Sequence, residues 1–266
     1  MIREPAVAGK FYTGDGDLLR EELASMVPHA EPERVLGIIA PHAGYMYSGK
    51  VAGRVYGAIR VPDTVLVLGP NHTGLGSPAA LSPPGEWLTP LGTVPIDSRL
   101  SGLILEHAPV VHEDPTAHRF EHSLEVQLPF LQYRNPKVSI AALCLSLLDL
   151  AALSRLSEGI ARAIKAYGGE VLMVASSDMT HYESAAHAKA KDDLALAEVA
   201  HLNPEALLKV CRQQDITMCG VIPAAVMLMV AKMLGAKSSR LVAYSTSGEA
   251  SGDFRRVVAY AAVTVS

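Results

Sequence analysis

The sequence predicts an α/β fold, a single-domain sandwich around a central mixed sheet with helices on its faces. Three apolar runs are typical of buried strands, and each is followed by a turn that holds a histidine: residues 35–42, 64–72 and 170–181. Apolar residues at helical spacing lie between the first two runs, and so short a crossover implies parallel strands. Because no fixed-period repeat and no interdomain linker divides the chain, we expect one domain over residues 1–266.

The chain begins with an arm and a strand, helix, strand unit. Residues 1–17 are rich in Gly, Pro and Asp but contain the apolar piece AVAGKFY, so we expect an ordered arm, followed by a short helix over 18–26. After a strand over 35–40, Ser48 is expected to cap a helix whose apolar residues repeat at helical spacing. A strand over 64–69 completes the unit.

Proline and glycine mark the next segment. Residues 75–96 hold many of both between short apolar pieces, which suits a β-hairpin excursion near the edge of the sheet. Asp97 is expected to cap a helix that runs through His107. Helical spacing resumes over 121–133, where Pro129 is expected to bend the helix because its ring blocks one backbone hydrogen bond.

The remaining elements alternate between strand and helix patterns. Strand patterns cover four segments: 138–145, 171–175, 240–245 and 256–265. Helix patterns cover four segments: 149–168, 185–200, the run after Asn203-Pro204, and 220–233. Asp149 starts the first of these helices, the pair Gly168-Gly169 stops it, and Asn203 caps the third with Pro204 at its first position.

Composition narrows the class of function. The chain is 49% hydrophobic and 19% charged, as in compact folded proteins, and its formal net charge of -4 comes without a basic cluster, so we expect no nucleic acid partner. No apolar stretch reaches the roughly 18 to 20 residues that span a bilayer, and the first residues lack the apolar segment of a signal peptide. Three cysteines without a CxxC pair fit a reducing compartment. We therefore expect a cytoplasmic protein that does not enter a membrane.

Histidines at the ends of predicted strands are the first candidates for chemistry. His42 and His72 each follow a strand, and Asp178 with His181 forms a short turn after another. Ligands in open α/β sheets bind at the carboxyl ends of strands, so these side chains could converge. Imidazoles and a carboxylate bind Zn, Fe, Cu or Mn, and they also serve as general acids and bases. The alternative is that each histidine is a hydrogen-bonded turn residue.

A cysteine and a second group of histidines are further candidates. Cys219 precedes a predicted helix start, where the helix dipole would favour a thiolate that acts as a nucleophile or soft metal ligand, although a buried inert thiol is the alternative. Cys144 and Cys211 are assigned to packing. His118 and His122 are four residues apart and would share a helix face, and we expect His122 and Glu121 to support metal ligands through hydrogen bonds rather than to bind the metal.

Several motifs, taken in order, resemble the Memo family over nearly the whole chain. They are AVAGKFYTGD, APHAGYMYSG, GPNHTG, FEHSLEVQLPFLQ, SSDMTHY and MCG. The resemblance implies a fold similar to that of the class III extradiol dioxygenases, with a metal pocket at strand ends. It places the metal ligands at His42, His72 and Cys219, with Asp178 and His181 beside them, and His181 is similar to the acid and base of the dioxygenases.

The resemblance also limits the chemistry. The related dioxygenases hold Fe(II) with two histidines and a carboxylate, whereas Cys219 stands at the third position here. A thiolate is softer than a carboxylate, which favours copper(I), zinc or thiolate-bound iron over catechol cleavage. The family implies iron or copper as cofactor, and its prokaryotic members are often encoded beside a radical SAM protein.

Three hypotheses follow for the function. The first is a metal-binding, redox-active protein with iron or copper at His42, His72 and Cys219, and with Asp178 and His181 positioned for proton transfer. The second is a binding module whose pocket accepts a peptide or a small aromatic molecule without metal. The third is a non-haem iron dioxygenase that cleaves aromatic rings.

Overall fold

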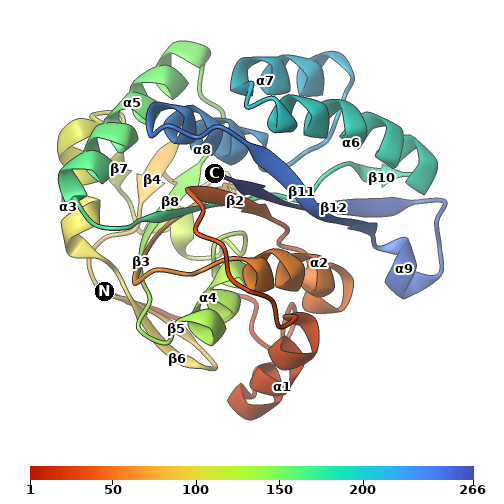
Figure 1. Cartoon of the computed structure of the whole chain (residues 1–266). Helices are drawn as coiled ribbons and strands as arrows, with labels where there is room; N and C mark the ends of the chain where they lie inside the picture. Colours follow the sequence, from red (N-terminus) through yellow and green to blue (C-terminus); the bar gives the residue numbers. More distant parts are fainter.

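A nine-stranded mixed sheet runs through the molecule (Figure 1). The computed structural model describes residues 1–266. Eight strands follow one another across the sheet: β10 (His181–Glu183), β12 (Val257–Val265), β2 (Gly37–Ala40), β9 (Leu172–Ser176), β3 (Thr64–Pro70), β8 (Ser139–Leu145), β4 (Ala79–Leu81) and β7 (His112–Glu113). The ninth, β11 (Ser239–Thr246), pairs with β12.

The centre of the sheet is parallel and its margins are mixed. Strands β2, β9, β3 and β8 run in one direction, whereas β12 is antiparallel to β2 and β4 is antiparallel to β8. Ala40 at the end of β2 is level with Ser176 at the end of β9. Because parallel strands end at the same edge, the residues that follow β2, β9 and β3 meet there.

Helices cover both faces of this sheet (Figure 1). One face carries five of them: α3 (Ser98–His107), α5 (Leu150–Tyr167), α6 (Ala185–Ala200), α7 (Pro204–Gln213) and α8 (Val221–Met233). The other face carries three helices and a small sheet: α1 (Gly16–Met26), α2 (Tyr45–Ala58), α4 (Leu128–Arg134), with β1 (Ile2–Arg3), β5 (Glu86–Thr89) and β6 (Gly92–Pro95). Short helical turns complete the chain: η1 (Thr116–His118), η2 (Glu125–Gln127) and α9 (Gly248–Ser251).

Two hydrophobic cores lie on either side of the sheet. Along β3, Leu66 and Leu68 enter the core beneath α5 and α8, whereas Val65 and Val67 enter the core beneath α1 and α2. Successive side chains of a strand point to opposite faces, so an uninterrupted apolar run is what a strand covered on both faces requires. The predicted α/β fold with a mixed sheet between helices is confirmed.

Several predicted helix ends are also confirmed. The side chains of Asp97, Asp149 and Asn203 each accept a hydrogen bond from a backbone N–H in the first turn of α3, α5 and α7. Gly168 ends α5 in the left-handed conformation, with a φ of 70°. No helix has both the length and the apolar composition that crossing a membrane requires.

The predicted cap at Ser48 is wrong. Helix α2 begins three residues earlier at Tyr45, with Gly44 as the capping residue. Ser48 is buried inside the helix, and its hydroxyl donates to the carbonyl of Ala43. A hydroxyl inside a helix can bond to a preceding carbonyl in this way, which the sequence pattern does not distinguish from capping.

The predicted helix over 121–133 is wrong at its start. Glu121 accepts hydrogen bonds from the backbone N–H groups of His122 and Ser123, so this segment forms a turn and regular α-helix begins only at Leu128. Pro129 lies in the first turn of α4, where its missing N–H does not bend the helix. His118 and His122 do not share a helix face, because His118 lies in η1 with its Nε2 against the carbonyl of Ala80.

Candidate metal centre

The carboxyl ends of three neighbouring strands place the first polar residues of the site. His42 follows β2, His72 follows β3, and Asp178 follows β9, which lies between them. The Asp178 carboxylate accepts a hydrogen bond of 2.8 Å from the backbone N–H of His42, which joins two of these strand ends. His42 and Asp178 are buried, and His72 is about one-third exposed.

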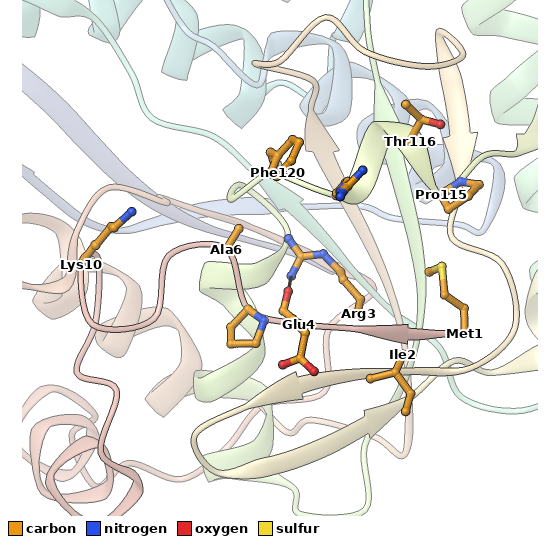
Figure 2. Close-up of a pocket in the computed structure, with 11 residues that line it drawn as sticks. Met1, Ile2, Arg3, Glu4, Ala6, Lys10, Pro115, Thr116 and Phe120 are labelled. Carbon is orange, nitrogen blue, oxygen red and sulfur yellow. Dashed lines mark hydrogen bonds between the residues drawn. The ribbon is translucent and has the colours of Figure 1, made fainter.

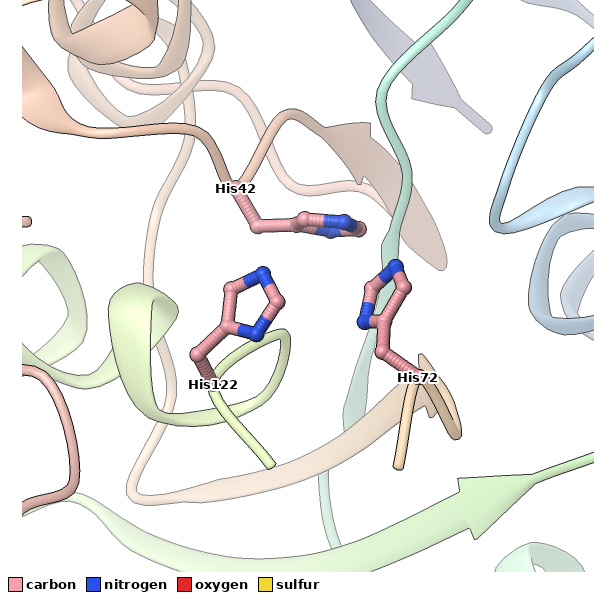
Figure 3. Close-up of side chains that lie close together, drawn as sticks. All are labelled: His42, His72 and His122. Carbon is pink, nitrogen blue, oxygen red and sulfur yellow. The ribbon is translucent and has the colours of Figure 1, made fainter. Parts of the chain in front are cut away.

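A third histidine comes from the turn before η2. His122 lies beside His42 and His72, and one ligand nitrogen from each of the three rings can be chosen so that all lie within 4.8 Å of one another (Figure 3). The ring centres are 5.1 Å apart for His42 and His72, 5.5 Å for His42 and His122, and 4.7 Å for His72 and His122. Three imidazoles thus form one cluster.

Protein oxygens hold the Nδ1 atoms of two of the three rings by hydrogen bonds. The Nδ1 of His42 is 2.8 Å from the hydroxyl of Ser176, and the Nδ1 of His72 is 2.9 Å from the carboxylate of Glu121. The Nδ1 of His122 lies 3.4 Å from the same carboxylate, close enough for an ion pair if the ring is protonated but without a hydrogen bond. An imidazole that uses Nδ1 in this way has Nε2 left for another ligand. The cluster therefore has the arrangement that a metal centre needs.

Glu121 anchors two of the three histidines. Its buried carboxylate accepts from the Nδ1 and the backbone N–H of His72, and from the backbone N–H groups of His122 and Ser123. Burial alone would raise the pKa of Glu121, but the hydrogen bond and charge of His72 together with the N–H of Ser123 lower it to about 2. The carboxylate is therefore ionised at neutral pH.

Burial favours the neutral form of two of the imidazoles, His42 and His122. Burial lowers the pKa of His42 well below its ordinary value, and the neighbouring rings of His72 and His122 lower it further. Burial also lowers the pKa of His122, against the opposing charge of Glu121. Neutral imidazoles keep a free lone pair, and a free lone pair is what binds a metal ion.

Cys219 lies against His42 on another side of the cluster. Its sulfur is 3.3 Å from the Nε2 of His42 and accepts from the backbone N–H of Asp178. Gly220 permits this approach, because a Cβ there would lie 2.2 Å from the carbonyl oxygen of Ser176. The sulfur is not part of the mutually close set of three nitrogens, so ligation by Cys219 stays a prediction.

The thiolate character expected for Cys219 stays a prediction, and burial opposes it in the metal-free protein. Burial raises the pKa of this thiol far above its ordinary value, and the nearby charge of Asp178 raises it further. These effects outweigh the dipole of α8. The neutral thiol would have to lose its proton to bind a metal ion.

Asp178 and His181, predicted to transfer protons, lie next to the cluster. Burial raises the pKa of Asp178 to about 6, although hydrogen bonds from the backbone of His42 and Ala43 oppose this. His181 is partly exposed at the start of β10, and its Nδ1 donates to the carbonyl of Thr217 at 3.0 Å. This leaves its Nε2 without a protein partner, as an acid or base requires.

The donor set suits a transition metal ion. Three nitrogens that bind one metal ion lie roughly 3.4 to 3.6 Å apart, because each bond is roughly 2.1 Å long and the ligands spread around the ion. The spacing of up to 4.8 Å is wider, so the three rings would have to close by about 1 Å to bind one ion together. Imidazoles suit Zn, Cu, Fe and Ni, so the three rings fit the class of metal but do not select one.

The sequence predicted an ordered amino-terminal arm but not that this arm supports the segment of His122. Arg3 donates to the carbonyl of Glu121 and forms a 2.7 Å ion pair with buried Glu125, which also accepts from the backbone of Ala6 and Val7. These contacts join residues more than 110 positions apart in the chain, so no pattern of neighbouring residues in the sequence predicts them. An arginine within an apolar amino-terminal strand was the one available signal.

A surface hollow lies against this arm. It has a volume of about 800 Å³ and is lined by the amino-terminal residues together with Pro115, Thr116, Arg119 and Phe120 (Figure 2). None of the three clustered histidines lines it. Donor chemistry rather than the size of the hollow therefore identifies the candidate site.

Comparisons with known proteins find matches over nearly the whole chain. A family model described as Memo-like protein matches residues 3–264. A MEMO1 family protein of Aquifex aeolicus is 42% identical over 263 residues, which cover 97% of each chain. One from Methanopyrus kandleri is 38% identical, over 99% of this chain and 98% of its own, and one from Methanosarcina barkeri is 40% identical, over 99% of this chain and all of its own.

Proposed function

This chain belongs to the Memo family, and from that premise we propose that it is a metal-binding protein with iron or copper at the histidine cluster. The observation that carries the proposal is the convergence of His42, His72 and His122, with the Nδ1 of His42 and the Nδ1 of His72 each hydrogen-bonded to a protein oxygen. Such oxygens orient ligand histidines in metal sites.

His42 and His72 are the ligands common to both possible donor sets. His122 completes a set of three imidazoles, whereas Cys219 completes the set implied by the family resemblance. The thiol lies 3.3 Å from the Nε2 of His42, so it is close enough to share an ion with that ring. A thiolate ligand favours iron or copper(I), with zinc as a further candidate.

We propose that the pocket is redox-active. Iron or copper, when bound, supplies one-electron chemistry and Lewis acidity. Asp178, with a pKa of about 6, and His181, with a free Nε2, are positioned to hold or move a proton beside the cluster. Partial exposure of His72 and His122 leaves access for a small molecule or a peptide.

Elemental analysis tests the proposal directly. Protein purified anaerobically from its native host should contain close to one equivalent of iron or copper. Combined replacement of His42 and His72 by alanine should abolish metal uptake, whereas His29→Ala, which changes an exposed histidine outside the cluster, should not. Full occupancy in the double variant would contradict the proposal.

Spectroscopy separates the two donor sets. Loading with Cu(II) should give a sulfur-to-metal charge-transfer band if Cys219 is a ligand, and Cys219→Ser should remove it. His122→Ala should lower copper affinity by about 10-fold or more if the three imidazoles are the set. Partner binding that survives chelation of all metal would instead support the metal-independent binding module.

A further inference from the structure

Ser176 presents a single hydroxyl to three hydrogen-bonding partners. It is the last residue of β9 and is fully buried. Its Oγ lies 2.6 Å from the carbonyl oxygen of Ser123, 2.8 Å from the Nε2 of Gln127 and 2.8 Å from the Nδ1 of His42. A carbonyl oxygen can only accept, so the one proton of the hydroxyl is donated to Ser123.

The orientation of Gln127 is fixed by the groups around it. Its Nε2 lies 3.0 Å from the carbonyl of Pro41, which can only accept, so this atom is the amide nitrogen. Its Oε1 accepts from the hydroxyl of buried Tyr56 at 2.9 Å. Gln127 is therefore a donor to Ser176, and it occupies one of the two lone pairs of that hydroxyl.

Only one role then remains for His42. The Ser176 hydroxyl donates its only proton to the carbonyl of Ser123 and accepts a hydrogen bond from Gln127 with one of its two lone pairs. It can therefore only accept a hydrogen bond from His42, with the second lone pair. We propose that Ser176 and Gln127 are positioning residues that fix His42 as the tautomer with a proton on Nδ1 and a lone pair on Nε2. The inference rests on the proposed function in one respect: Nε2 of His42 is the nitrogen that would bind the ion.

The network matters because the ring of His42 has no carboxylate partner. At His72 the ionised Glu121 can only accept, so the tautomer of that ring needs no further support. A serine hydroxyl can donate or accept, and on its own it would permit either tautomer of His42. In the other tautomer the ring would carry its proton on Nε2. That proton would point towards Cys219, and Nε2 would have no lone pair for a metal ion. Gln127 and Ser123 together exclude that arrangement.

Nitrogen NMR tests the inference without any metal. Metal-free protein carrying ¹⁵N-labelled histidine is recorded at pH 8, and the His42 signals are identified by their loss in His42→Gln. We expect a protonated Nδ1 and an unprotonated Nε2 in the wild type, and a mixture of tautomers in Ser176→Ala. A wild-type ring protonated on Nε2 overturns the inference.

Zinc affinity measured by calorimetry gives a second readout. Ser176→Ala should weaken zinc binding by about 10- to 100-fold. Ser176→Thr, which keeps the hydroxyl, should restore most of the affinity and the Nδ1–H tautomer. Ser157→Ala, which removes another fully buried hydroxyl in α5, should change neither.

These readouts separate the inference from the proposed function. An unchanged tautomer together with an unchanged zinc affinity in Ser176→Ala overturns the inference. If the wild-type protein binds no metal, the proposed function fails, whereas the tautomer in the metal-free protein still decides the positioning role. If Ser176→Ala does not fold, the wild-type spectrum and Ser176→Thr decide it.

Discussion

Among single residues, Glu121 has the greatest influence on the cluster. One buried carboxylate binds the ring and backbone of His72 and the backbone of His122. A buried charge is costly unless it is fully hydrogen-bonded, and here four N–H groups satisfy it. Glu121 therefore fixes the distance between two imidazoles that come from different parts of the chain.

The lowered pKa of Glu121 predicts a loss of stability in acid. In the folded protein the pKa of Glu121 is about 2, below its ordinary value of 4.5. The ionised carboxyl group therefore stabilises the folded state fully above pH 4.5, and this stabilisation is lost as the pH falls from 4.5 to 2. The contribution is about 3 kcal/mol. Urea unfolding of wild type and Glu121→Gln should differ most at pH 7 and converge near pH 2.

The exposed Glu106→Gln in α3 is the matched control and should follow the wild-type profile at every pH. If Glu121→Gln were as stable as the wild type at pH 7, the carboxylate would not hold the two histidines as described.

The sequence identified the site residues that follow strands but not the role of His122. His42 and His72 follow buried strands, and the strand-end rule finds such residues. His122 was predicted to play a supporting part on a helix face, whereas it lies in a turn whose position depends on Glu121 and Arg3. Contacts of that range leave no spacing in the sequence. Whether Cys219 or His122 completes the ligand set stays a prediction.

Among the elements, the amino-terminal arm and the start of α8 do most to position the site. Glu125 of η2 is fully buried and accepts from Arg3, from the backbone of Ala6 and Val7, and from the hydroxyl of Tyr12 at 2.7 Å. Arg3 also donates to the carbonyls of His118 and Glu121. The arm is thus tied to the segment that carries His122.

Replacement of Arg3 should destabilise this segment strongly. Arg3→Met leaves the buried carboxylate of Glu125 without its cation, which costs about 3 to 5 kcal/mol. We expect a lower urea midpoint and faster amide hydrogen exchange at His122 and Ser123. Arg3→Met combined with Glu125→Gln should recover part of the loss, because no unpaired charge remains.

Arg119→Gln provides the comparison for Arg3, since Arg119 lines the same hollow, is exposed and forms no ion pair. It should change stability by no more than about 0.5 kcal/mol. Equal losses in the two variants would show that the Arg3 ion pair does not brace the arm.

The start of α8 should tolerate no side chain at Gly220. A Cβ there would lie 2.2 Å from the backbone oxygen of Ser176, and backbone cannot yield as a flexible side chain does. Gly220→Ala should cost about 1 to 3 kcal/mol and should move Cys219 away from His42. Gly102→Ala in α3, where nothing lies within 4 Å of the added carbon, should be neutral or stabilising by up to about 1 kcal/mol.

Thermal unfolding of both glycine variants measures the change in stability. The rate at which a thiol reagent modifies Cys219 measures whether the sulfur has moved away from His42. A Gly220→Ala protein as stable as the wild type and with an equally protected thiol would mean that the packing of α8 on β9 is looser than the structure indicates.

In the whole molecule, the order of the strands is what turns distant residues into one site. The parallel run β2, β9, β3 brings positions 42, 72 and 178 to one edge, and this arrangement could be predicted because apolar runs followed by histidine turns repeat along the chain. The turn over 121–127 could not be predicted, because its leucines have the same helical spacing as those of α4. The hydrogen bonds of the Glu121 carboxylate to the backbone form the turn instead. Periodicity reports burial and not the hydrogen bonds of a buried carboxylate.

Because the cluster joins three separate segments, metal binding should stabilise the whole fold. A ligand that binds only the folded state adds about 2.7 kcal/mol at a concentration of 100 times its dissociation constant, which corresponds to a rise in Tm of roughly 5 to 10 °C for a domain of this size. Calorimetric scans of chelated protein, with and without added Fe(II) under anaerobic conditions or Cu(I), should show this rise in the wild type and in His29→Ala. His72→Ala should show none, because its ring is the link between the end of β3 and the Glu121 turn. A rise of equal size in His72→Ala would place the stabilising metal elsewhere on the chain.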